Sequence, residues 1–115
     1  MFTGPKPRLV NMVIEWLKVK VSPELREKFI QKDAEIWTSK LASYPGFLSK
    51  EVWIVPGTST ELVLVIRWAS REQWQAIPSE ELVQTEQKFN QEFGGEYQFI
   101  EESEYQVRKF PLMSS

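Results

Sequence analysis

The stretch Glu61–Trp68, with the sequence ELVLVIRW, decides the fold of this 115-residue chain. Its run of aliphatic and β-branched residues, from Leu62 to Ile66, predicts a β-strand. Both alternating faces of this strand are apolar, which is typical of a central strand that is covered on both sides. One layer of helices can cover only one of the two faces. The pattern therefore predicts that a second copy of the chain covers the other.

Strand and helix patterns alternate on both sides of this stretch. Period-two alternation indicates strands, apolar residues at three- to four-residue spacing indicate helices, and Pro and Gly mark the ends. We expect Ser22 and Ser70 to cap the first two helices. The predicted elements are a strand at 12–21, a helix at 22–43, strands at 47–55 and 61–68, helices at 71–76 and 79–93, and a strand at 97–107.

This order predicts a ferredoxin-like βαββαβ fold of the α+β class. Right-handed crossovers then give an antiparallel sheet with the helices on one face. Residues 11–110 are expected to form a single domain, preceded by a flexible arm at 1–10 and followed by a tail at 111–115. The uncovered face of the sheet is where assembly or function is expected.

The composition excludes several classes of site. The chain contains neither cysteine nor histidine, which excludes disulfides and thiolate metal sites and removes the commonest general base and metal ligand. The net charge of -2 is spread over interspersed acidic and basic residues, without the basic stripe of a nucleic-acid-binding protein. No apolar stretch suits a signal peptide or a spanning helix. We therefore expect a cytoplasmic protein without a metal, a cofactor, a nucleic-acid partner or a membrane partner.

Three charged residues lie inside predicted strands and are candidates for chemistry. Arg67 ends the apolar run, and a buried guanidinium needs an acceptor nearby. Glu15 and Glu51 lie on other strands, and burial of either carboxyl group would raise its pKa and make it a base. The alternative, which we favour, is a structural ion pair at a dimer interface. The sequence does not fix the strand register, so it does not say which acid meets Arg67.

Two of the five tryptophans are candidates for ligand binding. Trp53 and Trp68 lie on strands that have an uncovered face, whereas core packing is the ordinary role of a buried indole ring.

Several short segments resemble the antibiotic biosynthesis monooxygenase-like (ABM) domains of the dimeric α+β barrel superfamily. These are Tyr44-Pro45-Gly46-Phe47, Leu62–Trp68, Ala69-Ser70 and Gln73-Trp74. The resemblance covers about residues 12–108 and is nearest to a cyanobacterial branch without an assigned activity. It implies a homodimer whose two sheets form a barrel, with a pocket between sheet and helices.

The resemblance also implies a cofactor-independent monooxygenase that acts on a small aromatic molecule. Arg67 would then stabilise an oxyanion, with Glu15 or Glu51 as the base. Trp68 would stack on the substrate and Trp53 would line the pocket.

Two alternatives remain open at this point. The first is a non-catalytic interaction dimer, whose barrel is filled by tryptophans. The second is a haem protein like the IsdG-like enzymes, which are similar in the strand-end tryptophan, here Trp68. Their haem-ligating histidine falls near Glu86 and their catalytic asparagine near Glu15 or Trp16, so a histidine-ligated haem is excluded.

Overall fold

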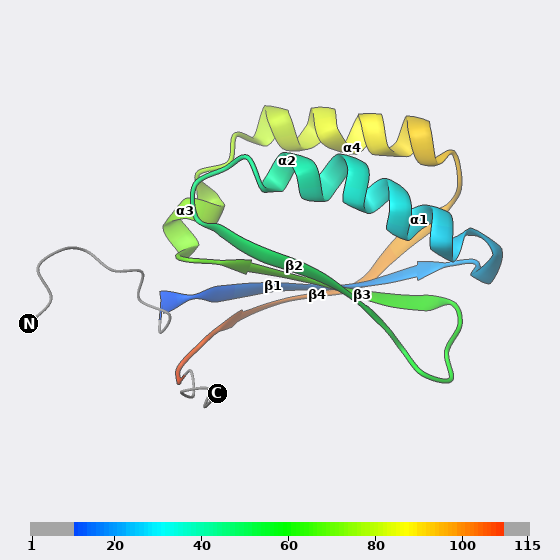
Figure 1. Cartoon of the computed structure of the whole chain (residues 1–115), viewed down its shortest axis with the longest axis horizontal. Helices are drawn as coiled ribbons and strands as arrows, with labels where there is room; N and C mark the ends of the chain where they lie inside the picture. The colour runs from blue at the N-terminus through cyan, green and yellow to red at the C-terminus, as the bar shows by residue number, and fades with distance from the viewer. Residues whose placement is uncertain (1–10, 110–115) are drawn as a thin grey trace, which may run out of the picture.

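The computed structural model describes residues 11–109, in which helices pack on one face of a four-stranded antiparallel sheet (Figure 1). The strands are β1 (Val13–Val21), β2 (Phe47–Ile54), β3 (Glu61–Trp68) and β4 (Tyr97–Gln106). The helical segments are η2 (Pro23–Leu25), α1 (Arg26–Lys32), η3 (Asp33–Thr38), α2 (Ser39–Leu41), α3 (Arg71–Gln75) and α4 (Ser79–Phe93). The predicted βαββαβ order is confirmed. The arm at 1–10 and the tail at 111–115 lie outside the described residues.

The sheet order β2-β3-β1-β4 places β3 between two neighbours, as predicted. Leu62, Leu64, Ile66 and Trp68 face the helices, and all four are buried. On the other face Val63 and Val65 are only 5% and 1% exposed, because their register neighbours include the large side chains of Trp53 and Trp16. The burial of β3 therefore does not by itself require a second copy of the chain.

The first helical stretch is less regular than the sequence predicts. A 3₁₀ turn precedes α1, and the π-helical segment η3 separates α1 from α2. The prediction that Ser22 caps this stretch is wrong, because its side chain makes no capping hydrogen bond. π-helical turns change the direction of the side chains that follow and are frequent at functional sites.

The start of β2 and the helix α3 fit together closely. Ser70 caps α3 as predicted, because its Oγ accepts a hydrogen bond from the backbone N–H of Gln73 at 3.2 Å. Gly46 has a φ of +90°, and a Cβ at that position would collide with the side chain of Gln73. Only glycine suits both requirements.

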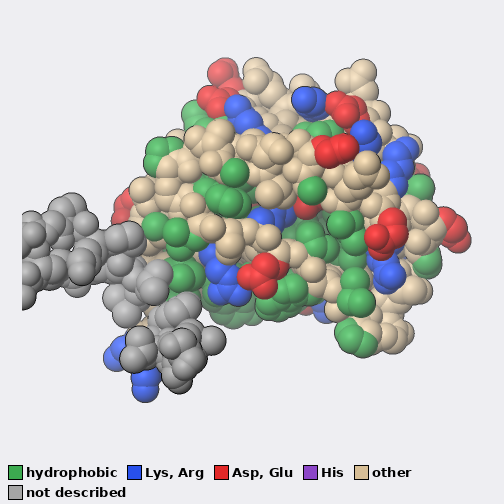
Figure 2. All heavy atoms as spheres, in the orientation of Figure 1, with side chains coloured by type: hydrophobic (Ala, Val, Ile, Leu, Met, Phe, Trp, Pro, Cys, Tyr) green, Lys and Arg blue, Asp and Glu red, His purple; other side chains and the backbone are tan. Residues whose placement is uncertain are grey.

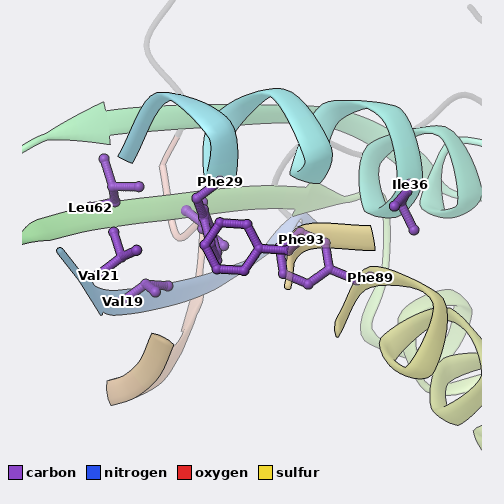
Figure 3. Packing of buried hydrophobic residues seen from close by; sticks show 8 residues of the cluster. Val19, Val21, Phe29, Ile36, Leu62, Phe89 and Phe93 are labelled. Carbon is purple, nitrogen blue, oxygen red and sulfur yellow. The ribbon is translucent and has the colours of Figure 1, made fainter. Parts of the chain in front are cut away.

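The core consists of two clusters between sheet and helices. In one cluster the ring of Phe29 meets Phe89 and Phe93 edge to face, with centroids 5.1 and 5.4 Å apart (Figure 3). The other cluster, at the opposite end of the sheet, includes Leu41 and Trp68. Edge-to-face contacts of this kind stabilise a core beyond their buried area.

The surface shown in Figure 2 carries hydrophobic, acidic and basic side chains mixed together. This face therefore presents no continuous basic patch. Within residues 11–109, no helix has the length and apolar character needed to cross a membrane.

Candidate functional site

A pocket of about 280 Å³ lies where the two core clusters meet, between the sheet and the helices. Its walls are largely apolar, with Trp37 from η3, Trp74 from the α3 helix and Leu82 from α4. Its volume is near the lower end of the range for small-molecule sites. The pocket therefore suits a small, largely apolar ligand.

Two charged residues on the strands that flank β3 line this pocket. Glu15 on β1 and Lys50 on β2 are both register partners of Ile66 on β3, one on each side of it. Ile66 faces the helices, so the side chains of Glu15 and Lys50 project from the same face, and both line the pocket.

The segment η3, which belongs to the layer of helices, supplies a third charged group to the pocket. Asp33 is 2% exposed, and its Oδ1 lies 2.7 Å from Lys50 Nζ, in a side chain that is 3% exposed. The second carboxylate oxygen, Asp33 Oδ2, is buried and has no hydrogen-bond partner among residues 11–109. Burial raises the pKa of Asp33, while the Lys50 ammonium acts in the opposite direction.

Glu15 is the group best suited to proton transfer. Burial raises its pKa from 4.5 to about 7, and the nearby charge of Glu102 acts in the same direction. Lys50 and the indole of Trp68 lower the pKa, but by less than burial raises it. A carboxyl group with this pKa is partly ionised near neutral pH and is far more basic than an ordinary glutamate.

The predicted role of Trp68 as a stacking platform needs correction. Trp68 is fully buried against Phe47 and is not among the residues that line the pocket. Its indole N–H approaches Glu15 closely enough to lower the pKa of that carboxyl group, but it forms no hydrogen bond of normal geometry. Trp68 therefore contributes to the environment of Glu15 rather than to a ligand-binding surface.

The other three predicted site residues lie together on the opposite face of the sheet. Arg67 Nε donates to Glu51 Oε2 at 3.0 Å, and Trp53 Nε1 donates to Glu51 Oε1 at 3.1 Å. Both hydrogen bonds lower the pKa of Glu51, and the bond from Trp53 has the larger effect. Glu51 is therefore a weak base. Trp53 itself is 43% exposed.

The sequence-based prediction of one site containing all five residues is therefore corrected. Alternation along β3 directs Arg67 to the uncovered face, whereas its neighbour Ile66 faces the pocket beside Glu15. The sheet itself separates Glu15 and Trp68 from Arg67, Glu51 and Trp53.

The sequence-based prediction missed Asp33 and Lys50. Asp33 stands four residues after Phe29 and four before Trp37, so a carboxylate interrupts an apolar helical stripe. That interruption is a signal that could have marked Asp33 as a buried charge. Lys50 carries no comparable signal, because only the register of β2 with β3 brings it to the pocket.

A larger hollow of about 1050 Å³ lies at the other end of the sheet, beside the start of β4. Its charged lining residues Lys20, Glu86 and Glu96 are all exposed to solvent. The lining of this hollow therefore contains none of the buried charged side chains that distinguish the smaller pocket.

Comparisons with known proteins agree with this architecture. A family model described as antibiotic biosynthesis monooxygenase matches residues 12–87, which is more than half of the chain. No curated protein matches the chain in sequence.

Several solved structures share the fold at low sequence identity. SnoaB, a cofactor-independent oxygenase from Streptomyces nogalater, has 13% identity and a TM-score of 0.60 over 87% of this chain and 96% of its own. The monooxygenase of ActVA-Orf6 from Streptomyces coelicolor, in complex with nanaomycin D, has 16% identity and a TM-score of 0.63 over 92% and 95%. A conserved protein from Methanosarcina mazei has 16% identity and a TM-score of 0.62 over 85% and 94%.

Proposed function

The chain belongs to the antibiotic biosynthesis monooxygenase family, and on this premise we propose that it oxygenates a small aromatic molecule without a cofactor. The observation that carries the proposal is Glu15, a carboxyl group with a pKa of about 7 on the wall of an apolar pocket. An oxygenase of this type requires a base that removes a proton from the substrate.

The chemistry proceeds through a substrate carbanion. Glu15 takes a proton from an activated C–H group, such as that of a phenolic anthrone, and the carbanion transfers electrons to O₂ and forms a C–O bond. The resulting peroxide anion takes the proton back from Glu15 and becomes a hydroperoxide. It then loses water and leaves a carbonyl group, so that one oxygen atom of O₂ enters the product and the other enters water.

We also propose that the protein is a homodimer joined through the uncovered face of the sheet. Trp53 and Tyr105 are 43% and 53% exposed on that face, which supports a buried role for them in an assembly. The Arg67–Glu51 pair lies on the same face and would be desolvated by a second copy. A cytoplasmic location remains a prediction from the sequence.

The non-catalytic dimer is the second candidate, and one observation favours it. Arg67 is engaged by Glu51 on the sheet face away from the pocket, as expected of a structural ion pair. Against it, the pocket near Glu15 is open rather than filled by tryptophans.

Oxygen uptake with a panel of anthrone-type phenols tests the monooxygenase proposal. We expect turnover by the wild-type protein and a rate at least about 100-fold lower for Glu15→Gln, which keeps the shape of the side chain and removes the base. Glu80→Gln, an exposed change at the start of α4, is the matched control and should keep full activity. Absence of uptake across the panel, or equal rates for wild type and Glu15→Gln, would count against the proposal.

A further inference from the structure

The buried Lys50–Asp33 pair has hydrogen-bonding capacity that the protein does not use. An ammonium group offers three N–H donors, and within the described part of the chain Lys50 Nζ donates only to Asp33 Oδ1. Asp33 Oδ2 has no partner, although it is buried. Buried polar groups without partners are costly and therefore rare, so these two groups call for an explanation.

The position of the pair points to a ligand. Lys50 and Asp33 both line the pocket, and Trp37, Trp74 and Leu82 form apolar walls beside them. The free acceptor of Asp33 and the spare donors of Lys50 therefore lie close together in the lining of a largely apolar pocket.

Charge restricts the ligand further. Asp33 neutralises Lys50, and the other carboxyl groups that line the pocket are those of Glu15, Glu86 and Glu102. An anionic ligand would meet no free positive charge there and would be repelled by these carboxylates.

We propose that the Lys50–Asp33 pair recognises a neutral, planar ligand that carries a hydrogen-bond donor next to an acceptor, as in a cyclic amide or an enolised hydroxy ketone. The donor of the ligand binds Asp33 Oδ2, and its acceptor binds the Lys50 ammonium. This inference rests on the proposed function and names the substrate class for the same pocket.

Two bicyclic probes of nearly identical shape test the proposal. 2-Quinolone carries an N–H donor beside its carbonyl group, whereas coumarin has a ring oxygen in place of the N–H. Isothermal titration calorimetry with the full chain should show 2-quinolone bound at least about 10-fold more tightly, because coumarin leaves Asp33 Oδ2 unsatisfied. Equal affinities, or no binding of either probe, would overturn the proposal and leave the pair a structural one.

A paired substitution shows whether Lys50 and Asp33 cause the preference. Asp33→Leu with Lys50→Met removes both charges together, and replacing a buried pair by apolar residues usually keeps a protein folded. This double variant should bind the two probes equally. Asp33→Asn provides a second check, since its amide can place a donor where the acceptor was and should reverse the preference. Retention of the wild-type preference in either variant would contradict the assignment.

The outcome separates this inference from the proposed function. Glu15→Gln should keep the preference for 2-quinolone, because Glu15 is not part of the donor–acceptor recognition. A protein that shows the preference but no oxygen uptake with any phenol would disprove the oxygenase proposal and leave this inference standing. Oxygen uptake without a preference for 2-quinolone would disprove this inference and leave the oxygenase proposal standing.

Discussion

At the scale of single residues, Glu15 shows how position on a strand changes the chemistry of a carboxyl group. Glu15 and Glu51 lie on strands of the same sheet, yet burial raises the pKa of Glu15, and hydrogen bonds from Trp53 and Arg67 lower that of Glu51. Only Glu15 faces the pocket. The two acids therefore differ: Glu15 suits the proposed role of a base, whereas the hydrogen bonds from Trp53 and Arg67 favour the ionised form of Glu51.

The raised pKa of Glu15 predicts the pH dependence of turnover. The charged groups around it are Lys50 on β2, Asp33 on η3, Glu86 on α4, and Glu102 and the register partner Glu104 on β4. As the pH rises through about 7, Glu15 loses its proton and becomes an active base, so kcat/KM for oxygen uptake should rise and then level off. A profile that is already flat from about pH 5 upward would show that another group is the base.

The same pKa predicts an effect on stability. The folded-state pKa of Glu15 lies above the ordinary value of 4.5, so between about 4.5 and 7 the unfolded chain binds fewer protons than the folded one, and stability falls as the pH rises. Glu15→Gln removes this penalty. Its free energy of unfolding should exceed that of the wild type by up to about 3 kcal/mol at pH 8, with little difference at pH 4.

Urea denaturation at both pH values measures this effect, with Glu80→Gln as the control for loss of an exposed carboxylate. If Glu15→Gln raises the free energy of unfolding equally at both pH values, the ionisation of Glu15 is not the cause of the stabilisation.

At the scale of elements, the helical segments show where local sequence rules hold. Both Ser22 and Ser70 precede a helical segment, yet only Ser70 forms a capping hydrogen bond. Both serines have an extended backbone. Ser22, however, leads into a 3₁₀ turn at Pro23, in which the N–H of Leu25 donates to the backbone carbonyl of Ser22 at 3.0 Å. The corresponding N–H after Ser70, that of Gln73, donates to the Ser70 Oγ. Both residues are serines, so the hydrogen bonding of the backbone in the first helical turn decides whether the cap forms.

Alanine substitutions at the two serines test this difference. Ser70→Ala should lower the free energy of unfolding by about 1 kcal/mol, because it leaves the Gln73 N–H without its acceptor. Ser22→Ala is the matched control, and its unfolding midpoint should stay close to that of the wild type. Equal losses for both variants in urea denaturation would contradict the assignment of the cap.

The segment η3 shows where local rules fail. Helical spacing in the sequence predicts one continuous helix, but the structure interrupts it with a π-helical turn that begins at Asp33. Asp33 is buried there and bonded to Lys50. The ion pair that polarises one end of the pocket therefore depends on an irregularity that periodicity does not reveal.

At the scale of the whole molecule, the two faces of the sheet have separate tasks. The covered face carries the pocket with Glu15, and the uncovered face carries the Arg67–Glu51 pair beside Trp53. We interpret the first as the site of chemistry and the second as the surface for a second copy.

Removal of Arg67 tests the assembly. In a dimer joined through this face, the Arg67–Glu51 pair is desolvated, and Arg67→Ala leaves Glu51 buried without its partner. The dissociation constant of the dimer should rise at least about 10-fold in sedimentation velocity experiments. Oxygen uptake should be unchanged at concentrations where the dimer persists, because Arg67 faces away from the pocket.

Arg71→Ala is the matched control for this experiment. It breaks the Arg71–Glu104 pair, whose side chains are 56% and 37% exposed, at the α3 end of the molecule. Such exposed pairs contribute little, so the dimer should be unaffected. A dimer of unchanged affinity in Arg67→Ala would remove Arg67 from the interface.

Patterns in the sequence were enough to predict the strands, the order of the elements, the central place of β3 and the resemblance to the family, but not the irregular course of the first helical stretch. These features follow from patterns between residues that are close along the chain, with a period of two in strands and of about 3.6 in helices. It also identified Glu15 as a candidate base and Arg67 as a residue that needs an acid.

Which of these residues meet depends on the three-dimensional fold. Register pairs Ile66 with both Glu15 and Lys50, the packing of β2 on β3 brings Glu51 to Arg67, and the π-helical turn brings Asp33 to Lys50. Each of these contacts joins strands or helices far apart in the sequence. The pKa of Glu15 depends on the same assembly, since burial by the whole layer of helices outweighs the nearby charge of Lys50.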